Sequence, residues 1–258
     1  MTAAEQTRPD HTRPDHTRDA LLGGRILIEQ PRRGQRATAD AVMLAAAVPA
    51  KRGQAVLELG AGSGVGMLCL AARLPGIAVD GIEIQPDLVA LAARNIAANG
   101  LEDRLRVVAG DLRRRVAGIT PNSYDQVFAN PPYFDTARHR ASPHAGRATA
   151  RSESGEADLP QWIAAMLRHA KPGGRLTLIH KAERLADILQ AFGSKAGGIR
   201  IVPLQSRQGE AAKRIIVSAV KGSRAPLELA PGLVLHGADG GYVPAVDAML
   251  RSGAAFPG

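Results

Sequence analysis

The tetrapeptide Asn130, Pro131, Pro132 and Tyr133 combines residue types that can bind a planar amine. Each proline fixes its own φ and restricts the residue before it, so the tetrapeptide is expected to be stiff and extended. The Asn130 side-chain oxygen and the Pro131 carbonyl can accept hydrogen bonds from the two N–H groups of an exocyclic amine. The Tyr133 ring can stack on the planar ring that carries this amine. Acceptors held in place lower a barrier through orientation and electrostatics. We predict that these four residues are catalytic; a turn that merely ends a strand is the alternative.

A glycine-rich loop, ELGAGSGVG at 58–66, directly follows a strand-like segment. Gly60, Gly62 and Gly64 allow the backbone to turn sharply and to approach a ligand closely. Open parallel sheets bind ligands at the carboxyl ends of their strands, which is where this loop lies. The spacing excludes the nicotinamide-dinucleotide fingerprint, which needs glycines at i, i+2 and i+5. The chain also has no G-x-x-x-x-G-K-[ST] phosphate loop, so the glycine loop alone does not identify its ligand.

Three acidic residues stand beside the ends of three successive strand-like segments. Glu83 can accept hydrogen bonds from two ribose hydroxyls, and Asp111 is within reach of an adenine amino group. Glu58 precedes the glycines and can anchor the loop or meet a ligand ammonium. No phosphate-binding Lys or Arg lies at the loop, so the three acids favour a ligand with adenosine and positive charge, such as S-adenosyl-L-methionine. Taken alone, each acid is more often a cap or a solvated strand end.

Strand-like and helix-like segments alternate along most of the chain. This alternation predicts one α/β domain with a doubly wound, mostly parallel seven-stranded sheet covered by helices on both faces. The last two strands are joined without a helix, so we expect an antiparallel hairpin at one edge of the sheet. The predicted strands are 24–30, 55–60, 78–84, 105–111, 124–130, 175–180, 199–204 and 213–220, and the predicted helices are 38–48, 65–74, 86–100, 159–170 and 183–192.

Residues 55–135 contain the motifs LELGAGSG, IEI, AGDL and NPPY. In this order and spacing they resemble the class I S-adenosylmethionine-dependent methyltransferases. More narrowly, the chain is similar to the bacterial enzymes that methylate N6 of the adenine beside the anticodon of valine tRNA. This second resemblance rests on ATADAVMLA, ATARSE and KRIIVSAVKG. It covers roughly residues 22–222 and implies a Rossmann-like methyltransferase fold.

The resemblance also implies the chemistry of the site. It implies S-adenosyl-L-methionine as cofactor and RNA, most directly tRNA, as the partner whose adenine amine is methylated. Asp40 approaches the methionine end of the cofactor by resemblance only. The predicted cofactor-binding residues are Asp40, Glu58, Gly60, Gly62, Gly64, Glu83, Ile84, Asp111, Leu112 and Asn130.

Three other functions remain open from the residues themselves. The same tetrapeptide suits a glutamine side-chain amide, as in release-factor methyltransferases, although we find no separate N-terminal helical domain of the kind those enzymes have. A small-molecule O-methyltransferase is compatible with the fold but does not need an amine clamp. The third alternative is a basic RNA-binding module that keeps a cofactor pocket as scaffold.

The chain carries a formal charge of +9, which favours polyanionic partners such as RNA or DNA before an anionic membrane. A generally arginine-rich proteome is the alternative explanation. The segment 138–151 contains no acidic residue, and we predict that its arginines bind phosphates. These arginines are Arg138, Arg140, Arg147 and Arg151.

The single cysteine, Cys69, excludes a disulfide framework and a cysteine zinc site, and it suits a reducing, cytoplasmic location. We predict no metal ligands, and no apolar run approaches the length of a membrane span. Residues 1–20 contain a polar TRPDH repeat and are expected to be a disordered tail. The methyltransferase domain is predicted over 21–224, with 21–50 leading into it. Residues 225–258 form a C-terminal extension without an assigned role.

Overall fold

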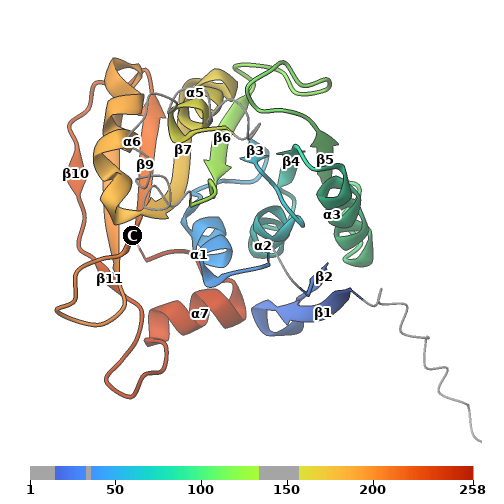
Figure 1. Cartoon of the computed structure of the whole chain (residues 1–258), viewed down its shortest axis with the longest axis horizontal. Coiled ribbons are helices and arrows are strands. Elements are labelled where there is room, and N and C mark those ends of the chain that lie inside the picture. The colour runs from blue at the N-terminus through green and yellow to red at the C-terminus, as the bar shows by residue number, and fades with distance from the viewer. Residues whose placement is uncertain (1–14, 33–35, 134–156, 258) are drawn as a thin grey trace, which may run out of the picture.

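Apolar strands build the centre of the molecule, and helices cover them on both sides (Figure 1). The structure is a computed structural model that describes residues 15–32, 36–133 and 157–257. Its large sheet has the strand order β10-β8-β9-β7-β6-β3-β4-β5, with β11 beside β8. The strands are β3 (Ala55–Leu59), β4 (Ala78–Glu83), β5 (Leu105–Ala109), β6 (Tyr124–Ala129), β7 (Ala170–Lys181), β8 (Ala196–Gln205), β9 (Arg214–Lys221), β10 (Glu228–Leu229) and β11 (Leu233–Val234).

Strands β3 to β7 run parallel, and β9 is antiparallel to both β7 and β8. The α/β, doubly wound and mostly parallel fold is therefore confirmed, together with the antiparallel β8–β9 pair. The prediction of seven strands was too low, because β10 and β11 add to β8 in parallel and give a nine-stranded sheet. The antiparallel pair consequently does not form the outer edge of the sheet.

Consecutive residues of the central strands point into two different hydrophobic cores. On β6, Val127 belongs to one core and Phe128 to the other, and Leu178 and Ile179 divide in the same way on β7. This alternation follows from the two-residue period of a strand, and a sheet buried on both faces needs apolar residues on both. The helices α1 (Ala39–Ala47), α2 (Val65–Arg73) and α7 (Pro244–Ser252) cover the core that contains Phe128, whereas α5 (Leu159–His169) and α6 (Leu185–Phe192) cover the core that contains Val127.

The helices begin near the positions that the sequence predicts. Pro86 occupies the first turn of α3, and Asp158 caps α5 in a reciprocal capping box with Gln161. Thr38 takes the N-cap position of α1, but its side chain makes no capping hydrogen bond. The helices are α1 (Ala39–Ala47), α2 (Val65–Arg73), α3 (Pro86–Ala98), α5 (Leu159–His169), α6 (Leu185–Phe192) and α7 (Pro244–Ser252), with 3-10 turns η1 (Leu22–Gly24), η3 (Ala182–Arg184) and η4 (Gly193–Lys195).

A separate two-stranded sheet forms from β1 (His16–Leu21) and β2 (Ile26–Pro31). The prediction of disorder was therefore wrong for residues 16–20, because the backbone of β1 pairs with β2 along its whole length. The backbone groups on the other edge of β2 bond to two side-chain amides, one in α3 and one at its C-cap. Asn95 exchanges two hydrogen bonds with the backbone of Glu29 (2.7 and 2.9 Å), and Asn99 does the same with Leu27 (3.0 and 2.7 Å).

The C-terminal segment is part of the domain and not an appendage. In α7, Val246 and Met249 are fully buried in the core that also contains α1. The guanidinium of Arg25 donates to the Ser252 carbonyl at 2.8 Å, so the end of α7 lies against η1. This burial corrects the predicted boundary at 224. Among the described residues, no helix has the length and apolarity needed to cross a membrane.

Candidate active site

The glycine loop connects β3 to α2 at the carboxyl edge of the sheet. Gly60, Gly62 and Gly64 have φ values of 68°, 57° and 85°, in the left-handed region that favours glycine. The loop is held to the neighbouring strand because the backbone N–H of Gly60 donates to the Ile82 carbonyl at 2.8 Å. A Cβ on Gly60 would come within 2.4 Å of the Trp162 ring. Trp162 is buried and packs against the loop itself.

Glu83 ends β4 directly beside this loop and is 5% exposed. Its two carboxylate oxygens accept the backbone N–H groups of Gly62 and Gln85, each at 2.9 Å. Each oxygen of an ionised carboxylate has two acceptor positions, so one on each remains for a ribose hydroxyl. The next residue, Ile84, is a large apolar side chain with 51% exposure and offers a surface for an adenosine ring. This part of the site fits the cofactor that the sequence predicts.

The sequence left two roles open for Glu58, to anchor the loop or to meet a ligand ammonium. In the structure Glu58 is an anchor. It is buried, and one of its carboxylate oxygens accepts the backbone N–H of Met67 at 2.8 Å, which fixes the first turn of α2. Burial raises the pKa of Glu58 to about 8, and the charge of nearby Glu83 adds to this rise. At neutral pH Glu58 is therefore mainly protonated and holds the helix as a neutral group.

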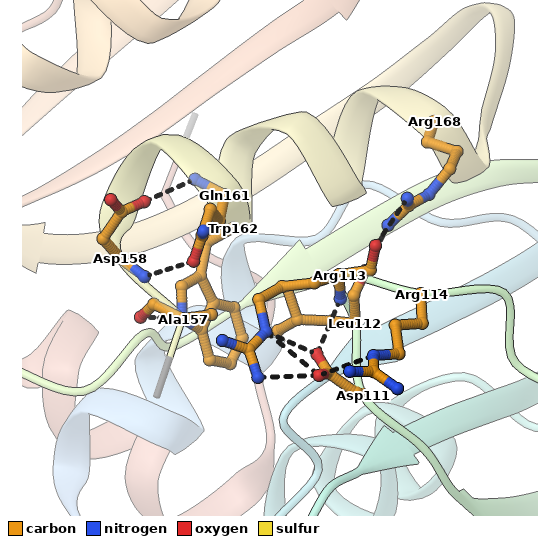
Figure 2. A network of polar contacts seen from close by, with 9 residues as sticks. All are labelled: Asp111, Leu112, Arg113, Arg114, Ala157, Asp158, Gln161, Trp162 and Arg168. Atoms are coloured by element: carbon orange, nitrogen blue, oxygen red, sulfur yellow. Dashed lines mark hydrogen bonds and ion pairs between the residues drawn. The ribbon is translucent and has the colours of Figure 1, made fainter. Parts of the chain in front are cut away.

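Asp111 follows β5 but is already bound by arginine (Figure 2). Arg113 chelates its carboxylate through Nε and Nη2 at 2.7 to 3.0 Å and also donates its backbone N–H at 2.9 Å. These bonds hold the pKa of Asp111 below its usual value. The Nε atom of Arg114 lies 3.8 Å from Oδ2 of Asp111. An adenine amine can therefore reach Asp111 only if Arg113 moves. Leu112 is buried, and its carbonyl accepts a hydrogen bond from Arg168.

The Asn130–Tyr133 tetrapeptide leaves the carboxyl end of β6 next to the glycine loop. β6 pairs with β3 so that Ala129 lies opposite Leu59, which places the tetrapeptide and the glycine loop side by side. Pro131 is buried, whereas Asn130 and Tyr133 are half-buried. The Asn130 side chain makes no hydrogen bond within the described part of the chain, so its amide oxygen is available as an acceptor.

Tyr133 is held by three residues from separate elements. Its hydroxyl donates to the Asp40 carboxylate at 2.9 Å, and Arg214 Nε contacts the same carboxylate oxygen at 2.8 Å. The ring of His180 stands edge-on to that of Tyr133, with centroids 5.2 Å apart and planes at 69°. The structure thus ties Asp40 to the tetrapeptide. This arrangement does not show the contact between Asp40 and the methionine end of the cofactor that the resemblance implied. The buried Asp40 carboxylate is already paired with Tyr133 and Arg214.

Arg113, His180 and Arg214 are the site residues that sequence analysis did not identify. For Arg214 a signal was available. An antiparallel strand begins at the edge where parallel strands end, so the predicted last strand had to place its first residues beside the site. His180 and Arg113 carried no comparable signal. The predicted nucleic-acid-binding residues Arg138, Arg140, Arg147 and Arg151 lie outside the described residues.

Metal ligands are not grouped in the part of the chain that the structure describes. No set of three or more His, Cys, Asp or Glu side chains in those residues is arranged to hold a metal ion. Cys69 is buried in α2, and burial raises the pKa of its thiol to about 12, so it behaves as a small apolar side chain.

A glycine loop after β3, a carboxylate that ends β4 and a rigid tetrapeptide after β6 define a class I methyltransferase that uses S-adenosyl-L-methionine. The model of the methyltransferase small domain family matches residues 36–148. The chain belongs to the family of tRNA1(Val) (adenine(37)-N6)-methyltransferases. It is 30% identical over 234 residues to the member from Porphyromonas gingivalis, a match that covers 85% of this chain and 89% of that protein.

Two further comparisons agree with this class. The family member from Tolumonas auensis is 29% identical over 221 residues, which cover 84% of this chain and 89% of that protein. The crystal structure of a predicted O-methyltransferase from Agrobacterium tumefaciens is 29% identical, with a TM-score of 0.70. That match covers 84% of this chain and 98% of the other.

Proposed function

We propose that this enzyme methylates the N6 amine of an adenine in RNA, and that its RNA is a tRNA. The proposal is carried by one observation, the Asn130–Tyr133 tetrapeptide beside the glycine loop, in a chain whose relatives are named for this reaction. The proposed reaction uses these residues and needs neither a metal ion nor a covalent nucleophile.

The tetrapeptide supplies what an adenine amine lacks. The lone pair of this amine is delocalised into the purine ring, so the nitrogen is a poor nucleophile. Acceptance of its two N–H bonds by the Asn130 side-chain oxygen and the Pro131 carbonyl draws the nitrogen towards a tetrahedral form. Pro131 and Pro132 keep both acceptors in place, and the Tyr133 ring supports the flipped base. As the new N–C bond forms, the nitrogen gives up one of its two protons to solvent water.

S-adenosyl-L-methionine, when bound, supplies a methyl group attached to a positively charged sulfur, and loss of this methyl group leaves the sulfur as a neutral thioether. The chain holds it through the left-handed turns at Gly60, Gly62 and Gly64, with Glu83 accepting the ribose hydroxyls. Ile84 packs against the adenosine. We assign Asp111 to the adenine amine only when Arg113 has moved away.

The charge of the chain supports a nucleic-acid partner. A net charge of +9 raises the local concentration of a polyanion and makes its binding salt-dependent. We propose that Arg138, Arg140, Arg147 and Arg151 contact RNA phosphates, since they follow the tetrapeptide directly in sequence. We propose a cytoplasmic location, which a tRNA substrate and the single cysteine support.

The test is transfer of a labelled methyl group. The protein is incubated with deuteromethyl S-adenosyl-L-methionine and with total RNA and total protein from cells that lack the gene. Digestion and mass spectrometry then identify the labelled nucleosides and peptides. Labelled N6-methyladenosine in the tRNA fraction supports the proposal. Label only in a glutamine peptide, or transfer only to a phenol in a salt-insensitive reaction, contradicts it; the latter is what the Agrobacterium tumefaciens structure's name would suggest.

A further inference from the structure

Arg214 and His180 belong to neither of the two motifs that define the site, yet both lie at its target side. β9 runs antiparallel to β7, and its first residue, Arg214, is paired with Lys181 at the last position of β7. His180 is the residue before Lys181. The carboxyl edge of the parallel strands therefore receives a guanidinium and an imidazole in addition to the tetrapeptide.

We propose that Arg214, acting through Asp40, and His180 are positioning residues that orient the Tyr133 ring against the target base. This inference rests on the proposed function, because it gives the ring a base to stack on. Neither residue needs to touch the substrate. Their role is to restrict Tyr133 to the one orientation that stacking requires.

The contacts act on two different parts of the Tyr133 ring. Its hydroxyl is fixed at the tip by a single Asp40 oxygen, which Arg214 Nε also contacts at 2.8 Å. The edge-on ring of His180 limits rotation of the Tyr133 ring about its own axis. A phenol that is held at its tip and against a neighbouring ring keeps a single rotamer.

Arg214 is required because Asp40 is buried. The Asp40 side chain is 6% exposed, and burial raises its pKa, whereas the charge of Arg214 and the bond from Tyr133 oppose that rise. A buried carboxylate that loses its cation is left uncompensated or takes a proton. A protonated carboxyl is a weaker acceptor for the Tyr133 hydroxyl, and a charged one without Arg214 loses the second contact that fixes its orientation.

His180 is suited to a neutral packing role. Its Nδ1 accepts the backbone N–H of Lys181 at 2.9 Å, so the ring proton of the neutral form lies on Nε2. Burial lowers the pKa of His180 to about 4, and the charge of Arg184 contributes to the decrease. At neutral pH it therefore brings a ring and no charge to Tyr133.

An alternative is that the Asp40–Arg214 pair merely joins α1 to β9. The two roles are separated by kinetics on tRNA with Arg214→Gln, Arg214→Lys, His180→Asn and the control Arg200→Gln. Arg200 also pairs with a carboxylate, Glu228 at 3.1 Å, but it lies nearer the middle of β8. We expect Arg214→Gln to lower kcat about tenfold while the Kd of the cofactor changes less than about twofold.

The other variants have distinct expected results. Arg214→Lys keeps the positive charge but not the guanidinium geometry, so it should recover part of kcat. His180→Asn should lower kcat about threefold, since it removes only the ring contact. Arg200→Gln should match the wild-type enzyme. A purely structural pair would instead lower the Tm of Arg214→Gln and weaken cofactor binding together with RNA binding, with no recovery by lysine.

The orientation of Tyr133 can be measured without activity. The chain has three tyrosines, so 3-fluorotyrosine labelling gives three fluorine NMR signals, and Tyr133→Phe assigns one of them. Arg214→Gln should shift the Tyr133 signal and leave those of Tyr124 and Tyr242 in place. An unshifted signal, or a kcat equal to wild type, overturns the proposal. Should the wild-type enzyme not methylate RNA at all, the proposed function fails, and the fluorine signal alone decides the positioning of Tyr133.

Discussion

The two halves of the site satisfy their buried carboxyl groups in different ways. In the cofactor half, Glu58 and Glu83 accept backbone N–H groups of the glycine loop and of α2. In the target half, Asp40 accepts from the side chains of Tyr133 and Arg214. Backbone donors exist only when the loop is folded correctly, and only a substitution by proline removes one. Side-chain donors can be replaced one at a time, so the target half can be altered while the fold and the cofactor half remain intact.

The largest expected effect is that of Gly60→Ala in the cofactor half. The new methyl group combines a positive φ with a 2.4 Å approach to Trp162, and together these should cost about 3 kcal/mol of unfolding free energy. Gly53→Ala is the matched control, because Gly53 has a φ of 83° and no atom near its would-be Cβ. Denaturant unfolding of the two variants measures the difference. Equal losses would show that Trp162 does not restrain the loop.

Glu58→Gln should stabilise the protein at alkaline pH. Unfolded Glu58 loses its proton near its ordinary pKa of 4.5, whereas the folded protein keeps it up to about 8. The wild-type protein therefore becomes less stable as the pH rises between these values, and the glutamine variant does not. The gain should be near zero at pH 4.5 and on the order of 4 kcal/mol at pH 8. Guanidinium unfolding at both pH values tests it, with the exposed Glu102→Gln as control, and a pH-independent difference contradicts it.

Asn130→Ala should separate the two halves. It removes one hydrogen-bond acceptor from the target amine, which is worth about 1.5–3 kcal/mol, so turnover should fall roughly tenfold or more. Cofactor binding, measured by calorimetry, should stay at the wild-type value because Asn130 bonds to no described residue of the glycine loop. Unchanged turnover would remove Asn130 from the reaction, and lost cofactor binding would move it to the cofactor half.

The smallest effect is expected at Asp111. In Arg113→Ala the carboxylate is free for the adenine amine, so the cofactor should bind about two- to fivefold more tightly. Arg114→Ala is the control, since Arg114 is 84% exposed and 3.8 Å from Asp111. Calorimetric titration with S-adenosyl-L-methionine measures both variants. Weaker binding in Arg113→Ala would mean that Arg113 supports the adenine site and does not compete with it.

The cofactor half could be predicted from sequence because its parts are local. The glycine loop, Glu83 and Ile84 follow successive strands, and parallel strands bring their ends to one edge. The target half could not be predicted, because Tyr133 and Asp40 are 93 residues apart in the sequence and Arg214 lies on an antiparallel strand. Composition also misled: the polar repeat suggested disorder through residue 20, although β1 begins at His16. β10 and β11 have only two residues each, which is too short for a period-two pattern.

The contact between η1 and α7 makes this fold a good candidate for circular permutation. Residues 22–25 lie against the end of α7, where Arg25 binds the Ser252 carbonyl and a Cβ on Gly23 would come within 2.8 Å of the Arg251 carbonyl. The start of β1 lies one six-residue strand away from η1, so a flexible linker has to span about that length to join the segment after α7 to β1. New termini at the exposed turn around Gly53 would leave both halves of the site unbroken, with the glycine loop close to the new start of the chain.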